Sequence, residues 1–176
     1  DINNEFKSHD LKLSNESFYT NNSKYLKESN FFIITVPTPL IKKTVPDLKA
    51  LKKAFLNISK YIKKGDIIIV ESTVYPGVTR DLALKYIHKK NDLKINKDFY
   101  IGYSPERINP GDKKHQIENT NKILAIDTKN KDIVNKIKEV YRCITKKLVL
   151  SDSIEDAETA KVIENIQRDL NIALMN

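Results

Sequence analysis

The stretch IIIVESTVYPG, residues 67–77, decides the fold class: an apolar run without polar alternation ends in a compact loop of Ser, Thr, Pro and Gly. The stretches FFIITVPTP at 31–39 and FYIGYSPERINPG at 99–111 repeat this arrangement. Apolar runs of this kind are typical of parallel strands that are buried on both faces. An open parallel sheet binds its ligands at the carboxyl ends of its strands. We therefore expect the three loops to meet at one sheet edge and to hold a ligand there.

Amphipathic helices separate the apolar runs. In the first of them, apolar residues from Leu48 to Ile62 recur at spacings of three and four, with Pro46-Asp47 as a start signal and Gly65 as a stop. The other predicted helices cover residues 78–90 and 130–142, and the remaining predicted strands cover residues 122–126 and 147–150. Strand and helix alternate repeatedly, which predicts an α/β fold with a mostly parallel sheet.

A long helix is predicted from about Ser153 to the end of the chain. Asp152 followed by Glu155 resembles a capping box at its start. One face carries Lys161, Asn165 and Arg168, and the opposite face carries Ile163, Ile166, Leu170 and Leu174. Ile172 and Met175 interrupt the polar face, so the helix becomes apolar nearly all round, which predicts burial on every side. Since no stop signal precedes Asn176, we expect the chain to be a piece of a longer protein.

The composition is that of a soluble domain in a reducing compartment. The chain has 176 residues, of which 40% are hydrophobic and 31% charged. Its apolar runs are far shorter than the ~20 residues of a membrane span, and its start lacks the pattern of a secretory signal. The single cysteine, Cys143, excludes an internal disulfide and is expected to be a buried thiol. These features favour the cytoplasm.

The net charge of +8 raises the question of nucleic-acid binding. Only four of the 31 basic residues are arginine, and no basic stripe is interleaved with aromatic residues. Base-edge and bidentate phosphate recognition favour arginine over lysine. The pattern therefore indicates a lysine-rich solvated surface, and we expect neither a nucleic-acid partner nor a membrane partner.

Several common catalytic arrangements are missing from the sequence. The three histidines are scattered and lack metal-ligand spacing, so no metal site is expected. No nucleophile elbow is visible, and four glycines in total do not supply a glycine-rich phosphate loop.

Thr73 and Glu106 are candidate catalytic residues because each lies in a loop after a predicted strand. A partly desolvated Glu106 has the chemistry to move a proton, and the alternative is a loop carboxylate paired with Arg107. The Thr73 hydroxyl is suited to hold a water or a substrate oxygen, and the alternative is that it caps the next helix. The amides around Gly77, where that helix starts, are suited to receive an anion.

Lys161 and Asn165 on the last helix are candidates for binding an oxyanion. A cation and an amide donor on one helical face are the groups that stabilise developing negative charge. The alternative is an ordinary solvated face. Apolar residues, Ile172 and Met175, continue the same helical face, which favours a face that is covered by protein rather than by water.

Four stretches, taken together, closely resemble the nucleotide-sugar 6-dehydrogenases. They are VPTPL at 36–40, ESTVYPG at 71–77, residues 102–112 and residues 160–176. The resemblance runs in order through nearly the whole chain and is strongest to the branch that acts on UDP-N-acetylhexosamines in bacterial surface polysaccharide synthesis. Its most specific parts are SPERINPG at 104–111 and KVIENIQRD at 161–169.

The resemblance implies a Rossmann-like NAD-binding domain, a long central helix and a second domain for the UDP part. Residues 1–150 would be a partial NAD-binding domain that lacks its first strands, and residues 151–176 the start of the central helix. The implied reaction is two successive NAD-dependent oxidations at the sugar C6, from alcohol to aldehyde to carboxylate, with a cysteine thioester in the second. The implied substrate is a UDP-N-acetylhexosamine or UDP-glucose, and the implied assembly is a homo-oligomer.

Motif positions assign roles through the same resemblance. Lys161 and Asn165 would stabilise the oxyanion, while Glu106 and Thr73 would handle the proton and the hydrolytic water. Asp1 matches the acid that hydrogen-bonds the adenosine ribose. The expected cofactor-binding residues are Asp1, Val36, Thr38 and Thr73, and the expected substrate-binding residues are Arg107, Ile108, Asn109, Lys161 and Asn165.

The chain also departs from the family pattern. The family's opening strand and glycine-rich turn would precede Asp1, and its catalytic cysteine would follow Asn176. Cys143 lies before Lys161 in a different motif context and does not replace that cysteine. We therefore expect residues 1–176 alone to be inactive. The alternatives are an inactive fragment or interaction module of the same ancestry, and another NAD-linked Rossmann enzyme.

Overall fold

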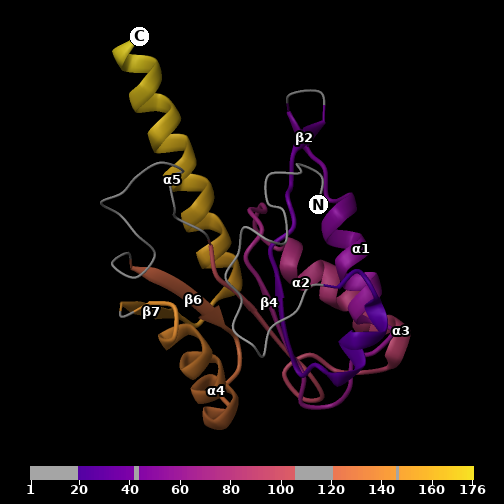
Figure 1. Ribbon diagram of the computed structural model, residues 1–176. Helices are drawn as coiled ribbons and strands as arrows, with labels where there is room; N and C mark the ends of the chain where they lie inside the picture. Colours follow the sequence, from indigo (N-terminus) through magenta and orange to yellow (C-terminus); the bar gives the residue numbers. More distant parts are fainter. Residues whose placement is uncertain (1–19, 42–43, 106–120, 146) are drawn as a thin grey trace.

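A five-stranded sheet organises the chain in the computed structural model, which describes residues 20–41, 44–105, 121–145 and 147–176 (Figure 1). Its strands are β1 (Phe31–Ile34), β4 (Ile67–Val70), β5 (Tyr100–Tyr103), β6 (Lys122–Ile126) and β7 (Leu148–Ser151), in the spatial order β1-β4-β5-β6-β7. A separate antiparallel pair consists of β2 (Leu40–Ile41) and β3 (Val45–Pro46). The predicted α/β fold with a mostly parallel sheet is confirmed.

One pair of neighbouring strands in the sheet is antiparallel. Strands β1, β4 and β5 run parallel, as do β6 and β7, but β5 and β6 are antiparallel, with Gly102 opposite Ile126. A parallel neighbour requires a crossover connection, whereas an antiparallel one does not. The sequence predicts no helix between residues 103 and 122, which agrees with the reversal at this point.

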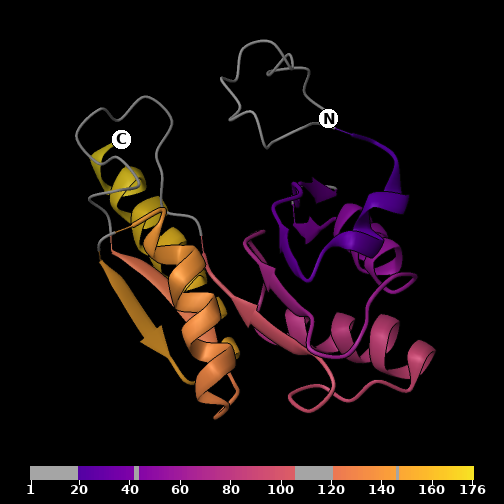
Figure 2. The ribbon, with the colours of Figure 1, turned by 60° about the horizontal axis from the view of Figure 1, so that its bottom comes forward.

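Helices cover both faces of the sheet. They are α1 (Lys49–Ile58), α2 (Val78–Ala83), α3 (Lys89–Asn91), α4 (Lys131–Arg142) and α5 (Ile154–Met175), with a 3-10 helix η1 (Ser23–Glu28) and a π-helical stretch η2 (Leu84–His88). Side chains of α1, α2 and the first turns of α5 pack in one apolar cluster with one face of the sheet. Helix α4 packs on the other face, through Ile133, Ile137 and Tyr141, and lies in front of the sheet in Figure 2.

The helix over residues 78–90 is continuous but not uniformly α-helical, because η2 lies between α2 and α3. The first predicted helix is shorter than expected: α1 ends at Ile58, and turns continue the chain to Gly65, which has a φ of 89°. The prediction of a buried Cys143 is wrong, since this thiol lies exposed after the end of α4. Its position on a solvent-facing turn explains the difference.

The second half of helix α5 extends away from the sheet (Figure 1). Ser153 caps its start by accepting a hydrogen bond from the Asp156 N–H, so the capping pair is not the predicted Asp152 and Glu155. The predicted burial on every side is not found in the described residues. The exposed apolar side chains of the second half are Ile163, Ile166, Leu170, Ile172, Leu174 and Met175. No helix among the described residues is both long enough and apolar enough to cross a membrane.

Gly102 lets β5 pass between its two neighbours. A Cβ at this position would lie 2.7 Å from the Ile69 Cδ1 of β4 and 2.8 Å from the Ala125 carbonyl oxygen of β6. Both approaches are shorter than real Cβ contacts. Pairing with both neighbours holds β5 in one layer with β4 and β6, and the candidate site is built at the ends of these strands.

We predict that Gly102→Ala lowers the free energy of unfolding by about 1–3 kcal/mol, because overpacking a close-packed core forces backbone or side-chain shifts. Urea unfolding monitored by circular dichroism measures this change. Ile69→Val removes the Cδ1 atom that the new Cβ would meet, so the double variant should lose less stability than the sum of the two single changes. A Gly102→Ala protein with unchanged stability contradicts this packing.

Candidate functional site

The carboxyl ends of β1, β4 and β5 lie side by side, as the sequence predicts. Hydrogen bonds continue one residue beyond the paired strands: the Glu71 N–H donates to the Ile34 carbonyl at 2.8 Å, and the Ser104 N–H donates to the Val70 carbonyl at 2.9 Å. The loops that follow these three strands therefore start from one edge of the sheet.

Side-chain hydroxyls fix the first two loops to each other. Thr38 Oγ1 donates a hydrogen bond of 2.7 Å to the Thr73 carbonyl, and Ser72 Oγ donates one of 2.6 Å to the Val36 carbonyl. Ser72 is buried, whereas the Thr73 side chain is exposed at the edge. The structure thus brings together three of the predicted cofactor-binding residues, Val36, Thr38 and Thr73.

The local alternative for Thr73, that it caps the next helix, is wrong. The N-cap residue of α2 is Gly77, whose φ of 92° is favoured only for glycine and which has no side chain to cap with. The predicted anion at this helix start is present, but it is part of the protein. Glu158 of α5 accepts from the Gly77 N–H at 2.6 Å and from the Thr79 N–H at 3.0 Å.

An ion pair also joins α2 and α5. Arg80 donates to both carboxylate oxygens of Glu155, at 2.7 and 3.3 Å, and also pairs with Asp127. The other oxygen of Asp127 accepts from the Ile154 N–H in the first turn of α5. The Arg80 hydrogen bond lowers the pKa of Glu155, and the Glu155 carboxylate raises the pKa of Arg80 further above its usual range. This cluster stabilises the start of α5 against the sheet.

Lys161 lies about two helical turns after Ile154 on α5 and is buried, with 8% of its surface exposed. It pairs with Glu164 on the same helix, with Nζ and Oε2 separated by 3.5 Å. Burial excludes the alternative of a solvated lysine face at this position. Asn165 is half-buried, and its side-chain oxygen accepts from the exposed Arg168.

A further polar cluster lies behind the strand ends. Lys122 of β6 is 5% exposed, and its Nζ lies 3.0 Å from a carboxylate oxygen of Glu71. The Tyr141 hydroxyl of α4 donates to the same carboxylate at 2.7 Å. Glu71 directly precedes Ser72 and Thr73, so this cluster fixes the point where the loop leaves β4.

The sequence analysis missed Glu158, the Arg80 cluster and the Glu71 cluster. A signal for Glu158 does exist: Ile154, Ala157, Glu158 and Lys161 follow the spacing of one helical face, and the structure buries all four. Five predicted site residues, Asp1, Glu106, Arg107, Ile108 and Asn109, lie outside the described residues. Within the part of the chain that the structure describes, no group of three or more His, Cys, Asp or Glu side chains is placed to hold a metal ion.

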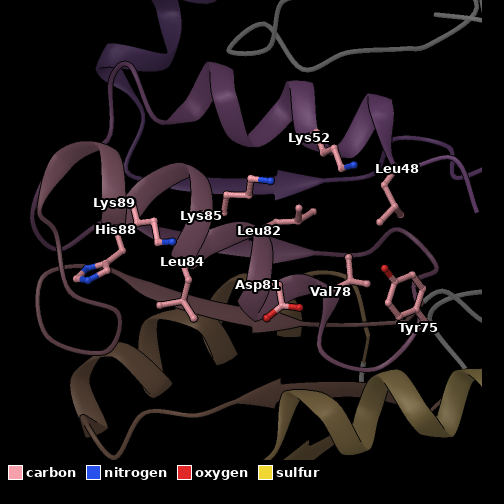
Figure 3. Close-up of a pocket in the computed structure, with 10 residues that line it drawn as sticks. All are labelled: Leu48, Lys52, Tyr75, Val78, Asp81, Leu82, Leu84, Lys85, His88 and Lys89. Atoms are coloured by element: carbon pink, nitrogen blue, oxygen red, sulfur yellow. The ribbon is translucent and has the colours of Figure 1, made fainter.

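A separate cavity of about 840 Å³ lies between α1 and the helix formed by α2 and η2 (Figure 3). Leu48 and Val78 contribute apolar surface, and Lys52, Lys85 and Lys89 carry amino groups at its borders. None of the predicted site residues lines it. The strand-end edge remains the better candidate, since three of the predicted site residues, Val36, Thr38 and Thr73, lie together there.

Comparison with known proteins identifies the family of the chain. The sequence profile described as "UDP-glucose/GDP-mannose dehydrogenase family, NAD binding domain" matches residues 4–145. The chain belongs to this family. A UDP-N-acetyl-D-glucosamine 6-dehydrogenase of Pseudomonas aeruginosa is 48% identical over 168 residues, which are 95% of this chain and 39% of that protein. An enzyme of the same name from Salmonella typhi is 45% identical over 177 residues, or 41% of its length.

Solved structures of the dehydrogenase family show the same fold. A UDP-D-ManNAc dehydrogenase from Pyrococcus horikoshii aligns with a TM-score of 0.78 at 33% identity, over 88% of this chain and 36% of that one. The UDP-N-acetyl-mannosamine dehydrogenase Cap5O from Staphylococcus aureus aligns with a TM-score of 0.70 at 34% identity, over 83% and 35%. The chain thus spans about two fifths of the curated relatives that it matches, and its residues 4–145 match the NAD-binding domain of the family.

We predict that Arg80→Ala lowers the free energy of unfolding by roughly 1 kcal/mol at pH 7, because the pair with the partly exposed Glu155 is screened by solvent. A carboxyl with a lowered folded-state pKa contributes stability above its unfolded pKa of about 4.3 and loses it as the pH falls through the folded value. The deficit of the variant should therefore shrink between pH 5 and pH 3. Urea unfolding at several pH values measures it, with the exposed Arg142→Ala as the control. A deficit that does not change with pH contradicts the pairing.

Proposed function

We propose that the protein containing this chain oxidises a UDP-N-acetylhexosamine at C6 to the uronic acid, with NAD as the oxidant. The names of the relatives support this substrate class, since the two described above act on UDP-N-acetyl-D-glucosamine. The observation that carries the proposal is the burial of Lys161, which is 8% exposed. Its helix, α5, is hydrogen-bonded through Glu158 to the backbone that follows Thr73.

The residues at the strand ends fit one side of an NAD site. Val36 and Thr38 follow β1 at the carboxyl edge, and the Thr38–Thr73 hydrogen bond holds two loops together there. We propose that Val36, Thr38 and Thr73 border the bound cofactor and that Asp1 binds its ribose. When bound, NAD accepts two electrons and one proton from the substrate carbon in each oxidation step.

The chemistry of the reaction explains the residue types on α5. Oxidation of an alcohol carbon requires the hydroxyl to lose its proton, and negative charge develops on that oxygen. A buried cation stabilises such charge more strongly than an exposed one, since the surrounding dielectric is low. We propose that Lys161 and Asn165 bind this oxygen, that Glu106 and Thr73 hold the proton and the water of the second oxidation, and that Arg107, Ile108 and Asn109 contact the sugar nucleotide.

We further propose a homo-oligomer in the cytoplasm. The exposed apolar side chains in the second half of α5 support self-association, because several large apolar side chains exposed on one helix indicate an interaction site. Size-exclusion chromatography with light scattering of the protein from the complete reading frame measures the oligomeric state.

The direct test is NADH production, followed by absorbance, with the protein encoded by the complete reading frame. We expect two NADH per sugar with a UDP-N-acetylhexosamine and slower turnover with UDP-glucose. No NADH production with UDP-N-acetylglucosamine, UDP-N-acetylmannosamine, UDP-N-acetylgalactosamine or UDP-glucose contradicts the proposed function.

We predict that Lys161→Met in the same protein lowers kcat by about 10²-fold or more, the usual cost of removing one group that stabilises developing charge. Methionine keeps the length of the side chain and removes its charge. The matched control, Lys136→Met on the exposed surface of α4, should keep normal kcat. Normal turnover of the Lys161 variant would show that another group stabilises the oxyanion.

A further inference from the structure

Glu158 is a fully buried carboxylate with two backbone partners far away in the sequence. Its exposed fraction is 0%, and its two oxygens accept from the Gly77 N–H at 2.6 Å and the Thr79 N–H at 3.0 Å. Burial of a carboxylate is costly unless hydrogen bonds compensate for the lost water. A carboxylate that is buried despite this free-energy cost is expected to have a specific structural role.

The hydrogen-bond pattern requires both oxygens of the side chain to be acceptors. An ionised carboxylate meets this requirement, whereas a glutamine offers one acceptor and would turn its NH₂ group toward an N–H donor. Burial raises the pKa of Glu158 above its usual value, and the two backbone donors counteract that effect. The ionisable groups that interact with it electrostatically include Glu155 on α5 and the buried Tyr103 on β5.

The position of Glu158 links the two halves of the candidate site. Lys161 lies three residues after it on α5, and Thr73 lies four residues before its partner Gly77. The Thr73 carbonyl in turn accepts a hydrogen bond from the Thr38 hydroxyl of the neighbouring loop. Displacement of the Gly77–Thr79 backbone from Glu158 would therefore change the position of α5 relative to both loops.

We propose that Glu158 is a positioning residue: its buried carboxylate fixes the loop of Thr73 to the first turns of α5 and so sets the distance between Thr73 and Lys161. Glu158 does not touch the reacting atoms and acts through the backbone of residues 77–79. This role rests on the proposed function for its effect on turnover. The contact itself is independent of that function.

The test compares Glu158→Gln with the wild type in the protein encoded by the complete reading frame. We expect kcat to fall at least tenfold with UDP-N-acetylhexosamine as the substrate, while KM for the sugar nucleotide changes less than threefold. Asp156→Asn, on the same helix and exposed to solvent, removes one negative charge and should keep normal kcat. Glu158→Asp keeps the charge with a shorter reach, so its kcat should also fall.

Amide hydrogen exchange followed by mass spectrometry separates positioning from general destabilisation. In Glu158→Gln we expect faster exchange in a peptide that covers residues 77–79 and unchanged exchange in one that covers β4. Normal kcat in the Gln variant, or equally fast exchange throughout the sheet, overturns the proposal. If the Gln variant does not fold, normal kcat in Glu158→Asp overturns it equally.

The two proposals fail in different ways. If the wild type turns over no nucleotide sugar, the proposed function fails. The exchange of residues 77–79 in the Gln variant still tests the contact: protection equal to that of the wild type shows that Glu158 does not hold this backbone.

Discussion

A buried carboxylate joins two segments that lie about eighty residues apart in the chain. Glu158 provides the hydrogen-bond acceptors that the start of α2 does not find in its own sequence, because Gly77 at the N-cap has no side chain. The unpaired N–H groups of a helix start require such partners. The first turns of α5 are thereby bound to the same helix start to which the loop of Thr73 leads. The positions of Lys161 and Thr73 both depend on this contact, and the Arg80 cluster reinforces it.

The sheet provides the second constraint, since it fixes where the loops begin. Gly102 permits a close approach of β4, β5 and β6, and hydrogen bonds beyond the strands align the first residues of the loops. The Glu71 cluster holds the end of β4 on the opposite face, against Lys122 and Tyr141. The exposed Thr73 is thus presented by a rigid strand end rather than by an independent loop, a favourable arrangement for a site that must keep its geometry.

Much of the fold was predictable, because long apolar runs and helical periodicity are strong local signals. The strand over residues 122–126 has the predicted bounds, and α4 begins one residue after the predicted start of its helix. The two-residue strands β2 and β3 are too short to show a period, and the sequence does not reveal them. The predicted burial of Cys143 was wrong because this residue lies in the solvent-facing turn that follows α4.

The candidate site was predictable to a smaller degree. Motif resemblance indicated Thr38, Thr73 and Lys161, and the structure shows the contact between the first two and the burial of the third. The helical spacing of Ile154, Ala157 and Glu158 signals burial of Glu158, but its partners were not predictable, because they are backbone amides of a helix that only the fold brings near. Sequence patterns describe side chains along one element, whereas a contact between two elements depends on how they pack.

The most direct measurement of the central claim is a crystal structure of the protein from the complete reading frame with NAD and a UDP-N-acetylhexosamine bound. The account predicts that the Lys161 amino group lies within hydrogen-bond distance of the sugar C6 oxygen. It also predicts that the cofactor rests against Val36, Thr38 and Thr73. Binding of the cofactor or the sugar in the cavity between α1 and α2, with Lys161 away from both, would contradict it.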